Sequence, residues 1–385
     1  MNIVSPKTDQ SASPEERAAH RSVLYKLPQP EPVPNMQAYL DEREKALASD
    51  PRRRANYETY RRSARTGAKL DYMPVKLDIE NVSRCNFKCT MCIVSDWHKG
   101  KRAEDMSLED FKRVIDENYG LVEIKLQGVG EPLLQGDDLF EMIRYARARD
   151  IWVRTTTNAS LLHLRDNHKK LIDSGVNEVQ ISIDGADKET FQKIRRGSVF
   201  ERVIDNCKLI NAYCDSIGVH RTKMWVVAQQ ANKHQLRELV DLAGELLFKS
   251  LVFTINLGDW AQGDWQEKNE AASIEAEWDP GFAMGLVEQG EKLGVKVRFW
   301  VNQEKYDYDS VDKLCPWPFE RAFVSSDMRV VPCCYVGNPD VFELGKIGEQ
   351  SFSDIWFSDT YKEFRATHFT GKTPEICRNC YKQRS

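Results

Sequence analysis

The sequence of 385 residues lacks the features that would point to a membrane, a secretion route or a nucleic acid. No stretch approaches about 18 consecutive uncharged apolar residues, which excludes an ordinary membrane-spanning helix. Residues 1–20 contain no apolar core like that of a signal peptide, so we expect a cytoplasmic protein in a reducing compartment. Because 55 basic residues face 59 acidic ones, there is no electrostatic source for nucleic-acid binding. We therefore expect neither a membrane nor a nucleic acid as partner.

The composition is that of a globular chain, with 41% hydrophobic and 30% charged residues. At about 150 residues per domain, the length suits one large domain or two to three ordinary ones. Residues 1–73 are polar and show no alternating apolar pattern. They predict an appendage with one or two solvated helices over 41–70, interrupted near Asp50 and Pro51.

From Pro74 onward, short runs with β character alternate with amphipathic helical stretches. This repetition predicts parallel strands joined by right-handed crossovers, in a (β/α) barrel or an open doubly wound sheet. In either fold the chemistry lies at the carboxyl ends of the strands. Ser107 with Asp110 fits a capping box for one of the helices. The expected strands cover residues 75–82, 121–126, 152–157, 178–183, 223–228 and 251–256.

The alternation breaks over residues 258–312, which we expect to connect two domains. Residues 313–385 predict a small second domain, with a hairpin over 322–333 and an aromatic helix over 353–364. The connecting segment carries three tryptophans that could stack on a substrate ring or pack between domains. They are Trp260, Trp265 and Trp278.

Ten cysteines in a reducing compartment predict metal ligands or catalytic thiols rather than disulfides. Cys85, Cys89 and Cys92 follow the first expected strand and gather three thiolates in one loop. A [4Fe-4S] cluster takes four thiolate-like ligands, so such a loop leaves one iron open to an amine and a carboxylate. A structural zinc site completed by His98 is the alternative.

A second group, Cys315, Cys333, Cys377 and Cys380, has the spacing C-x17-C-x43-C-x2-C. Four ligands suit either a complete [4Fe-4S] cluster or a tetrahedral zinc ion, and the spacing does not choose between them. Cys334 adjoins Cys333, and adjacent side chains of a strand point to opposite faces. We expect Cys333 to be the ligand and Cys334 to be free or buried.

The CxxxCxxC loop after the first strand resembles the radical SAM superfamily. The resemblance implies a partial (β/α)6 barrel over residues 74–257 and S-adenosyl-L-methionine (SAM) as cofactor, with Cys85, Cys89 and Cys92 holding the SAM-binding [4Fe-4S] cluster. Motifs after successive strands resemble the SAM contacts of this family. They are Gly130 and Glu131 in GVGE, Asn158, Ser182 and Asp184 in ISIDG, Arg195, and Met91 where the family often has an aromatic; Asn232 is a weaker match.

The second cysteine group resembles the auxiliary [4Fe-4S] cluster of twitch-type members, the shortened relatives of the SPASM domain. Together the resemblances imply that SAM is cleaved to a 5′-deoxyadenosyl radical, which takes a hydrogen atom from a substrate. We expect a small polyhydroxylated substrate (a sugar, nucleoside or aminocyclitol), oxidised at an alcohol carbon with the auxiliary cluster as electron acceptor. A donor such as flavodoxin or ferredoxin would supply the reducing electron.

Three alternatives stay open. Epimerisation would use Cys334 as hydrogen donor. Peptide modification commonly involves a leader-binding winged-helix segment, for which residues 1–73 show no strand pattern. A non-catalytic two-cluster electron carrier would gain nothing from the open iron at the first cysteine group.

Overall fold

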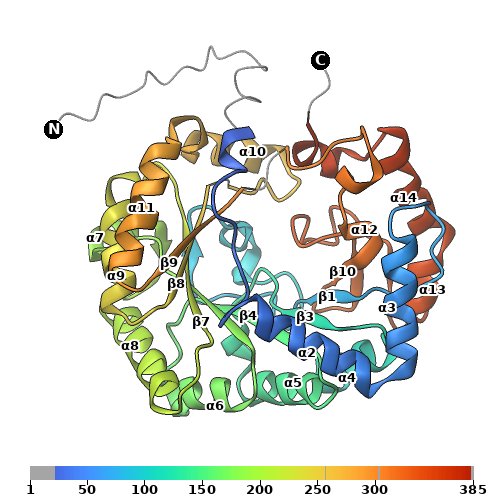
Figure 1. The fold of residues 1–385 in the computed structure, drawn as a ribbon, viewed down its shortest axis with the longest axis horizontal. Helices are drawn as coiled ribbons and strands as arrows, with labels where there is room; N and C mark the ends of the chain where they lie inside the picture. The colour runs from blue at the N-terminus through green and yellow to red at the C-terminus, as the bar shows by residue number, and fades with distance from the viewer. Residues whose placement is uncertain (1–21, 256, 302–303, 383–385) are drawn as a thin grey trace.

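The computed structural model describes residues 22–255, 257–301 and 304–382. Its main element is a ten-stranded sheet that curls into an incomplete barrel, with helices on the outside (Figure 1). The strand order is β12-β11-β10-β1-β3-β4-β5-β7-β8-β9. All neighbours from β10 to β9 are parallel, and only the last two pairings, which involve β11 and β12, are antiparallel. The fold class is therefore the predicted one.

The strands of this sheet are β1 (Lys76–Ile79), β3 (Glu123–Leu126), β4 (Trp152–Thr157), β5 (Glu178–Ser182), β7 (Thr222–Val227), β8 (Ser250–Thr254), β9 (Lys296–Trp300), β10 (Arg321–Val324), β11 (Arg329–Val331) and β12 (Gly345–Lys346). Two further strands, β2 (Lys88–Cys89) and β6 (Arg195–Arg196), form a separate antiparallel pair. The first six strands of the barrel confirm the six runs predicted from the sequence, apart from residue 256, which lies outside the described residues.

The helices are α2 (Met36–Ser49), α3 (Pro51–Ser63), α4 (Leu108–Glu117), α5 (Asp137–Arg147), α6 (Asn167–Asp173), α7 (Lys188–Ile194), α8 (Phe200–Ser216), α9 (Leu236–Glu245), α10 (Gly263–Ala272), α11 (Pro280–Lys292), α12 (Trp317–Glu320), α13 (Phe352–Phe357) and α14 (Asp359–Thr370). Short 3-10 turns include η3 (Pro132–Gln135) and η8 (Glu375–Cys380). At the start of α4 the Ser107 hydroxyl accepts from the Asp110 backbone amide at 3.0 Å, which confirms Ser107 as the N-cap. The Asp110 carboxylate accepts from the Ser107 hydroxyl rather than from the Ser107 backbone, so the second bond of the predicted capping box is not formed.

Two strands beyond the predicted six extend the parallel sheet on its two sides. The segment expected to break the alternation contains α10, α11 and β9, and β9 pairs with β8 over five residues. On the other side β10, the first strand of the expected hairpin, pairs in parallel with β1 before it turns back into β11. The C-terminal hairpin is therefore continuous with the barrel sheet, which places the second cysteine group beside the barrel interior.

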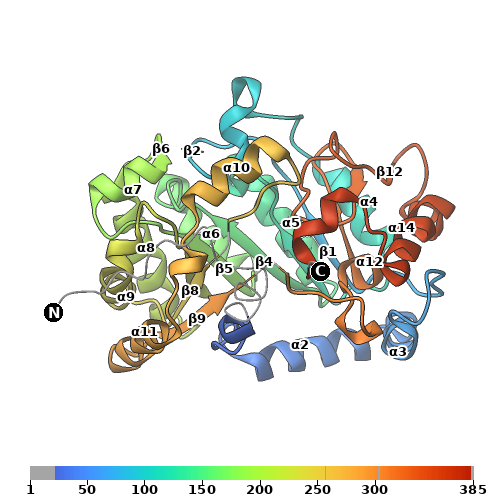
Figure 2. The ribbon, with the colours of Figure 1, turned by 90° about the horizontal axis from the view of Figure 1, so that it is seen from above.

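The N-terminal helices α2 and α3 form a layer on the barrel, not a solvated appendage as the sequence suggests. Arg53 donates to the carbonyls of Ala46 and Arg149, at 3.0 and 2.9 Å. The Tyr39 hydroxyl donates to Glu123 on β3 at 2.8 Å. These contacts are polar, so they leave no apolar stripe that a periodicity analysis would detect. Figure 2 shows α2 at the end of the barrel opposite β2 and β6.

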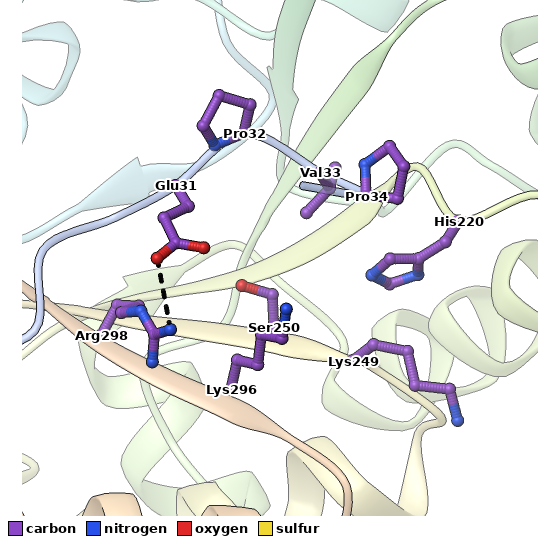
Figure 3. A pocket seen from close by; sticks show the side chains of 9 residues that line it. All are labelled: Glu31, Pro32, Val33, Pro34, His220, Lys249, Ser250, Lys296 and Arg298. Carbon is purple, nitrogen blue, oxygen red and sulfur yellow. Dashed lines mark hydrogen bonds and ion pairs between the residues drawn. The ribbon is translucent and has the colours of Figure 1, made fainter. Parts of the chain in front are cut away.

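Residues 28–34, which we call the N-terminal strap, run beside β9 and across the amino ends of β5 and β7. The Pro28 carbonyl accepts from Phe299 of β9 at 2.8 Å, and the Glu31 carbonyl accepts from Lys223 of β7 at 2.6 Å. The Val33 amide donates to Glu178 of β5 at 3.1 Å. Between the strap and the first residues of β8 and β9 lies a cavity of about 150 Å³, where Glu31 pairs with Arg298 (Figure 3). The strap thus covers the end of the barrel at which these strands begin.

Candidate functional site

The first cysteine loop lies at the carboxyl end of β1, where a parallel sheet places its chemistry. Cys89 belongs to β2, which pairs with β6 so that Cys89 lies opposite Arg195. The Arg195 guanidinium reaches the Cys89 sulfur at 3.8 Å. The Asn158 amide lies 3.9 Å from the Cys85 sulfur. The loop is therefore tied to the ends of β4 and α7 by side chains that point at its thiols.

The three thiols influence one another electrostatically. Burial, and then the neighbouring acid and cysteines, raise the pKa of Cys85, and burial together with Cys89 raises the pKa of Cys92 to about 12. Burial also raises the pKa of Cys89, against the lowering influence of Arg195. Three soft donors beside one fixed cation form a donor set that fits an iron–sulfur cluster, whose net charge is negative.

No three His, Cys, Asp or Glu side chains within the described ranges converge closely enough to hold a single metal ion. His98, the proposed fourth ligand of a zinc site, is exposed. A cubane cluster requires wider spacing, because each thiolate binds a different iron at its own corner.

The GVGE loop after β3 packs tightly against the end of β1. A Cβ atom on Gly130 would lie 2.2 Å from the Val82 carbonyl oxygen, and one on Gly128 would lie 2.1 Å from the Glu80 side chain. The Glu131 carboxylate accepts from the backbone amide of Asn158 and from the Thr157 hydroxyl, both at 2.7 Å. Burial raises the pKa of Glu131 to about 7. Glu131 thus joins the ends of β3 and β4, and its contact with SAM stays a prediction.

Asp184 and Arg195 form a buried ion pair of 2.7 Å at the ends of β5 and α7. Asp184 also accepts from the Val227 amide at 2.7 Å. Among the described residues the Arg195 Nε atom is buried and has no hydrogen-bond partner. An unpartnered guanidinium nitrogen beside the cysteine loop suits the carboxylate of a bound amino acid. Ser182, at the end of β5, is half-buried.

The side chain of Asn232, the weaker match, makes its hydrogen bonds with neighbouring backbone groups of the protein. Its amide donates to the carbonyls of Asp184 and Val227, both at 2.9 Å, and its oxygen accepts from Gln229 at 2.8 Å. It is fully buried and therefore serves to tie two loops together.

The second cysteine group is assembled from three places in the chain. Cys315 precedes α12, Cys333 follows β11, and Cys377 and Cys380 lie in η8. Burial raises the pKa of all four thiols, and each lies in the electrostatic field of others in the group. The Tyr381 hydroxyl accepts from the Cys315 amide at 2.9 Å and so ties η8 to the start of α12.

Cys334 differs from this group. Its thiol is exposed, yet it lies deep in the molecule because it faces an internal cavity. Burial and Asp78 raise its pKa, whereas Lys125 and Arg321 lower it. Cys333 lies in the field of Cys380, and Cys380 in turn lies in the field of Cys334. The choice of Cys333 as the ligand therefore stays a prediction.

Two cavities fill the barrel interior and share one wall. One, of about 290 Å³, reaches Met91 and Gly128 at the first cysteine loop. The other, of about 400 Å³, reaches Cys315, Cys333 and Cys380. The shared wall consists of Asp78, Lys125, Trp225, Trp300, Cys334 and Tyr335. A substrate in this space would lie between the two cysteine groups.

The predicted tryptophans have different positions. Trp278 packs in the core with Phe253 and Phe299, and Trp265 is buried under Lys268, so neither lines the two cavities. Trp260 does line the smaller cavity, and its indole donates to the Met91 carbonyl at 3.1 Å. The residues of the shared wall were missed by the sequence analysis apart from Cys334. The signal available in the sequence was the alternation of side chains along each strand, since every second residue of a barrel strand points to the interior.

The structure is an incomplete parallel barrel with the first cysteine group at its mouth and the second cysteine group beside its interior. This arrangement is typical of a barrel enzyme that holds iron–sulfur clusters. Residues 81–243 match the radical SAM superfamily, and residues 315–381 match the iron–sulfur cluster-binding domain called SPASM. The chain belongs to the radical SAM superfamily and carries a C-terminal SPASM domain. Its cofactors are accordingly SAM and [4Fe-4S] clusters.

Curated relatives differ in activity. The chain is 26% identical over 297 residues to the AdoMet-dependent heme synthase of Methanosarcina barkeri, covering 72% of this chain and 80% of the relative. It is 37% identical over 145 residues to the GTP 3′,8-cyclase of Aliarcobacter butzleri, covering 36% of this chain and only 42% of the cyclase.

Among solved structures, Streptococcus suis SuiB bound to the precursor peptide SuiA gives a TM-score of 0.61 at 16% identity, covering 81% of this chain and 71% of SuiB. The AdoMet-bound anSMEcpe structure gives 0.56 at 22% identity, covering 80% and 84%. These likenesses establish the fold. None of the helices in the described part of the chain has the length and apolar character of a membrane span.

Proposed function

We propose that this enzyme oxidises an alcohol carbon of a small polyhydroxylated substrate bound in the two cavities between its cysteine groups. The observation that carries the proposal is the shared wall, because it makes the cavity that reaches Met91 adjoin the cavity that reaches Cys380. Two indole rings of this wall, Trp225 and Trp300, offer apolar faces of the kind on which sugar rings and bases stack. The charged side chains around them offer hydrogen bonds to hydroxyl groups.

We assign the SAM-binding cluster to Cys85, Cys89 and Cys92 and the auxiliary cluster to Cys315, Cys333, Cys377 and Cys380. When bound, SAM and the clusters supply hydrogen-atom abstraction at one end of the cavity and an electron acceptor at the other, and loss of a proton completes the oxidation to a ketone. The chain's own residues orient the cofactor and exclude water. Arg195 offers a fixed cation at the cysteine loop, and the GVGE loop offers backbone at Gly130 because no side chain fits there.

The proposal is tested on anaerobically reconstituted protein. About eight iron and eight sulfide per chain are expected for two cubane clusters. Reduction with SAM should yield 5′-deoxyadenosine, and a panel of sugars, nucleosides and aminocyclitols should yield a carbonyl product that hydrazine reagents trap. About four iron with zinc making up the difference would remove the electron acceptor and refute the oxidation.

Two variants test the cysteine assignments. Cys89→Ala should lose about four iron and all 5′-deoxyadenosine formation, whereas Cys207→Ala, at another buried cysteine, should keep both. Cys380→Ala should retain SAM cleavage but lose the oxidised product. Formation of 5′-deoxyadenosine by Cys89→Ala would refute the assignment of the first group.

A second candidate function is epimerisation, which the position of Cys334 favours. Its thiol faces both cavities, and the protonated thiol, the ordinary form of cysteine near neutral pH, is the form that returns a hydrogen atom. In deuterated water an epimerase would place deuterium on a product carbon, and Cys334→Ser would abolish the product while 5′-deoxyadenosine still forms. A carbonyl product from Cys334→Ser would instead support oxidation.

A further inference from the structure

The barrel interior is charged where parallel barrels ordinarily carry branched apolar side chains. Five cationic side chains line the larger cavity, and most have an acid beside them. Arg154 pairs with Glu123, Lys223 with Glu178 at 3.1 Å, and Arg321 with Asp78 at 3.5 Å and with Glu320 at 3.4 Å. Lys305 lies over the Trp300 ring at 4.0 Å and in the field of Cys315 and Cys380.

Lys125 and Lys305 are the two of these cations that have no acid partner among the described residues, and Lys305 lies on an aromatic ring instead. Lys125 lies in β3 with Asp78 of β1 and Arg154 of β4 as its register neighbours, and it lines both cavities. Within the described residues its ammonium group has no acid within 4 Å and no hydrogen-bond partner. The nearby Asp78 carboxylate turns to Arg321.

Lys125 is half-buried and faces the two cavities. An ammonium inside a cavity without a counter-ion is costly, and the cost falls when an anion binds beside it. Burial lowers the pKa of Lys125, while Asp78 raises it, in agreement with such an incomplete pair. The ammonium lies in the one wall that both cavities share, so an anion beside it would sit in the middle of the substrate space.

We propose that Lys125 binds an oxyanion group, a carboxylate or a phosphate, on the substrate and thereby fixes its position between the two cysteine groups. This rests on the proposed function in taking the two cavities as the substrate site. It narrows the substrate class from polyhydroxylated compounds in general to acidic ones, such as sugar acids or sugar phosphates.

Cys334 provides a reporter, because it faces the same cavities and lies in the field of Lys125. In the reconstituted enzyme the two cysteine groups are occupied and Cys207 and Cys214 are buried. Alkylation of Cys334 by iodoacetate or iodoacetamide forms a thioether, releases iodide and passes the thiol proton to solvent. Since both reagents attack the same thiolate, the ratio of their rates measures only the preference for a negative reagent.

Lys125→Met should lower the ratio of the iodoacetate rate to the iodoacetamide rate at Cys334 by about tenfold. Peptide mass spectrometry measures the alkylation of Cys334 by each reagent. Lys208→Met, at an exposed lysine of α8, should leave the ratio unchanged. In the unmodified enzyme, acetate or inorganic phosphate should slow alkylation by iodoacetamide, and glycerol should not; the more effective anion identifies the group. An unchanged ratio in Lys125→Met, equal effects of glycerol and the anions, or no alkylation of Cys334 would overturn the proposal.

This experiment requires no SAM, reductant or turnover. If 5′-deoxyadenosine never forms, the proposed function fails while the rate ratio still reports on Lys125. If the ratio is unchanged while a neutral sugar is oxidised, only the inference about Lys125 fails.

Discussion

Replacing Glu123 by Gln should destabilise the protein by about 3 kcal/mol, the lower end of the range for breaking a buried ion pair. The Glu123 side chain is only 6% exposed and faces Arg154, Lys76 at 3.7 Å and the Tyr39 hydroxyl at 2.8 Å. The amide removes the charge, which leaves Arg154 without its acid partner and Lys76 with Glu320 alone, at 3.7 Å. We take the lower end because Arg154 and Lys76 are each 24% exposed and regain some hydration.

The pH dependence of this difference has a definite sign. Burial alone would raise the pKa of Glu123, but Arg154 and Lys76 hold this pKa well below its usual range. A lowered pKa contributes stability that is present above the unfolded-state value of about 4.3 and is lost as the pH falls through the folded-state value. The difference in the free energy of unfolding between wild type and Glu123→Gln should therefore stay constant between about pH 8 and about pH 5 and shrink at lower pH.

Urea denaturation of the reconstituted protein, followed by circular dichroism, measures this difference. Tyr39→Phe separates the hydrogen bond from the ion pair and should cost about 1.5 kcal/mol. Glu44→Gln, at an acid whose side chain is 57% exposed, is the matched control and should have little effect. If Glu123→Gln lies within about 1 kcal/mol of that control, the ion pair does not stabilise the fold in the way argued.

Three other substitutions have expected outcomes. Gly130→Ala should weaken SAM binding in equilibrium dialysis by about tenfold or more, because the added Cβ would meet the Val82 carbonyl at 2.2 Å, whereas Gly67→Ala, with no atom within 4 Å, should not. Arg195→Lys should weaken SAM binding by about tenfold with iron content unchanged, since an ammonium cannot reach Asp184 and Cys89 together; unchanged affinity would contradict this. Cys207→Ala should lower the free energy of unfolding by about 1 kcal/mol and leave the iron content intact; lost iron would make Cys207 a ligand.

Much of the architecture could be predicted because it depends on local pattern. The six strands beginning with β1 have runs of apolar residues, and the cysteine loop follows the first of them directly. The strand β9 was missed as part of the barrel because the long segment before it contains tryptophans and acids in place of a simple crossover. The parallel pairing of β10 with β1 was missed because it joins residues about 245 positions apart.

The candidate site was predictable where it rests on motifs and not where it rests on packing. Cys89 and Arg195 were recognised separately, and their contact depends on the small β2–β6 pair. Lys125 looks like a solvated charge on a strand in the sequence, and only the curling of the sheet turns it toward the cavities. The choice among Trp260, Trp265 and Trp278 also required the structure, since all three lie in one segment with similar surroundings in the sequence.

The N-terminal strap has a consequence for how the protein is made. Pro30, Glu31 and Pro32 of the strap line the larger cavity, yet they leave the ribosome before the strands on which the strap docks. Its contact with Phe299 cannot form until almost four-fifths of the chain has been synthesised. The floor of the cavity therefore closes late, after the first cysteine loop has emerged. A protein engineered to begin at the first barrel strand would carry both cysteine groups but would lack this floor.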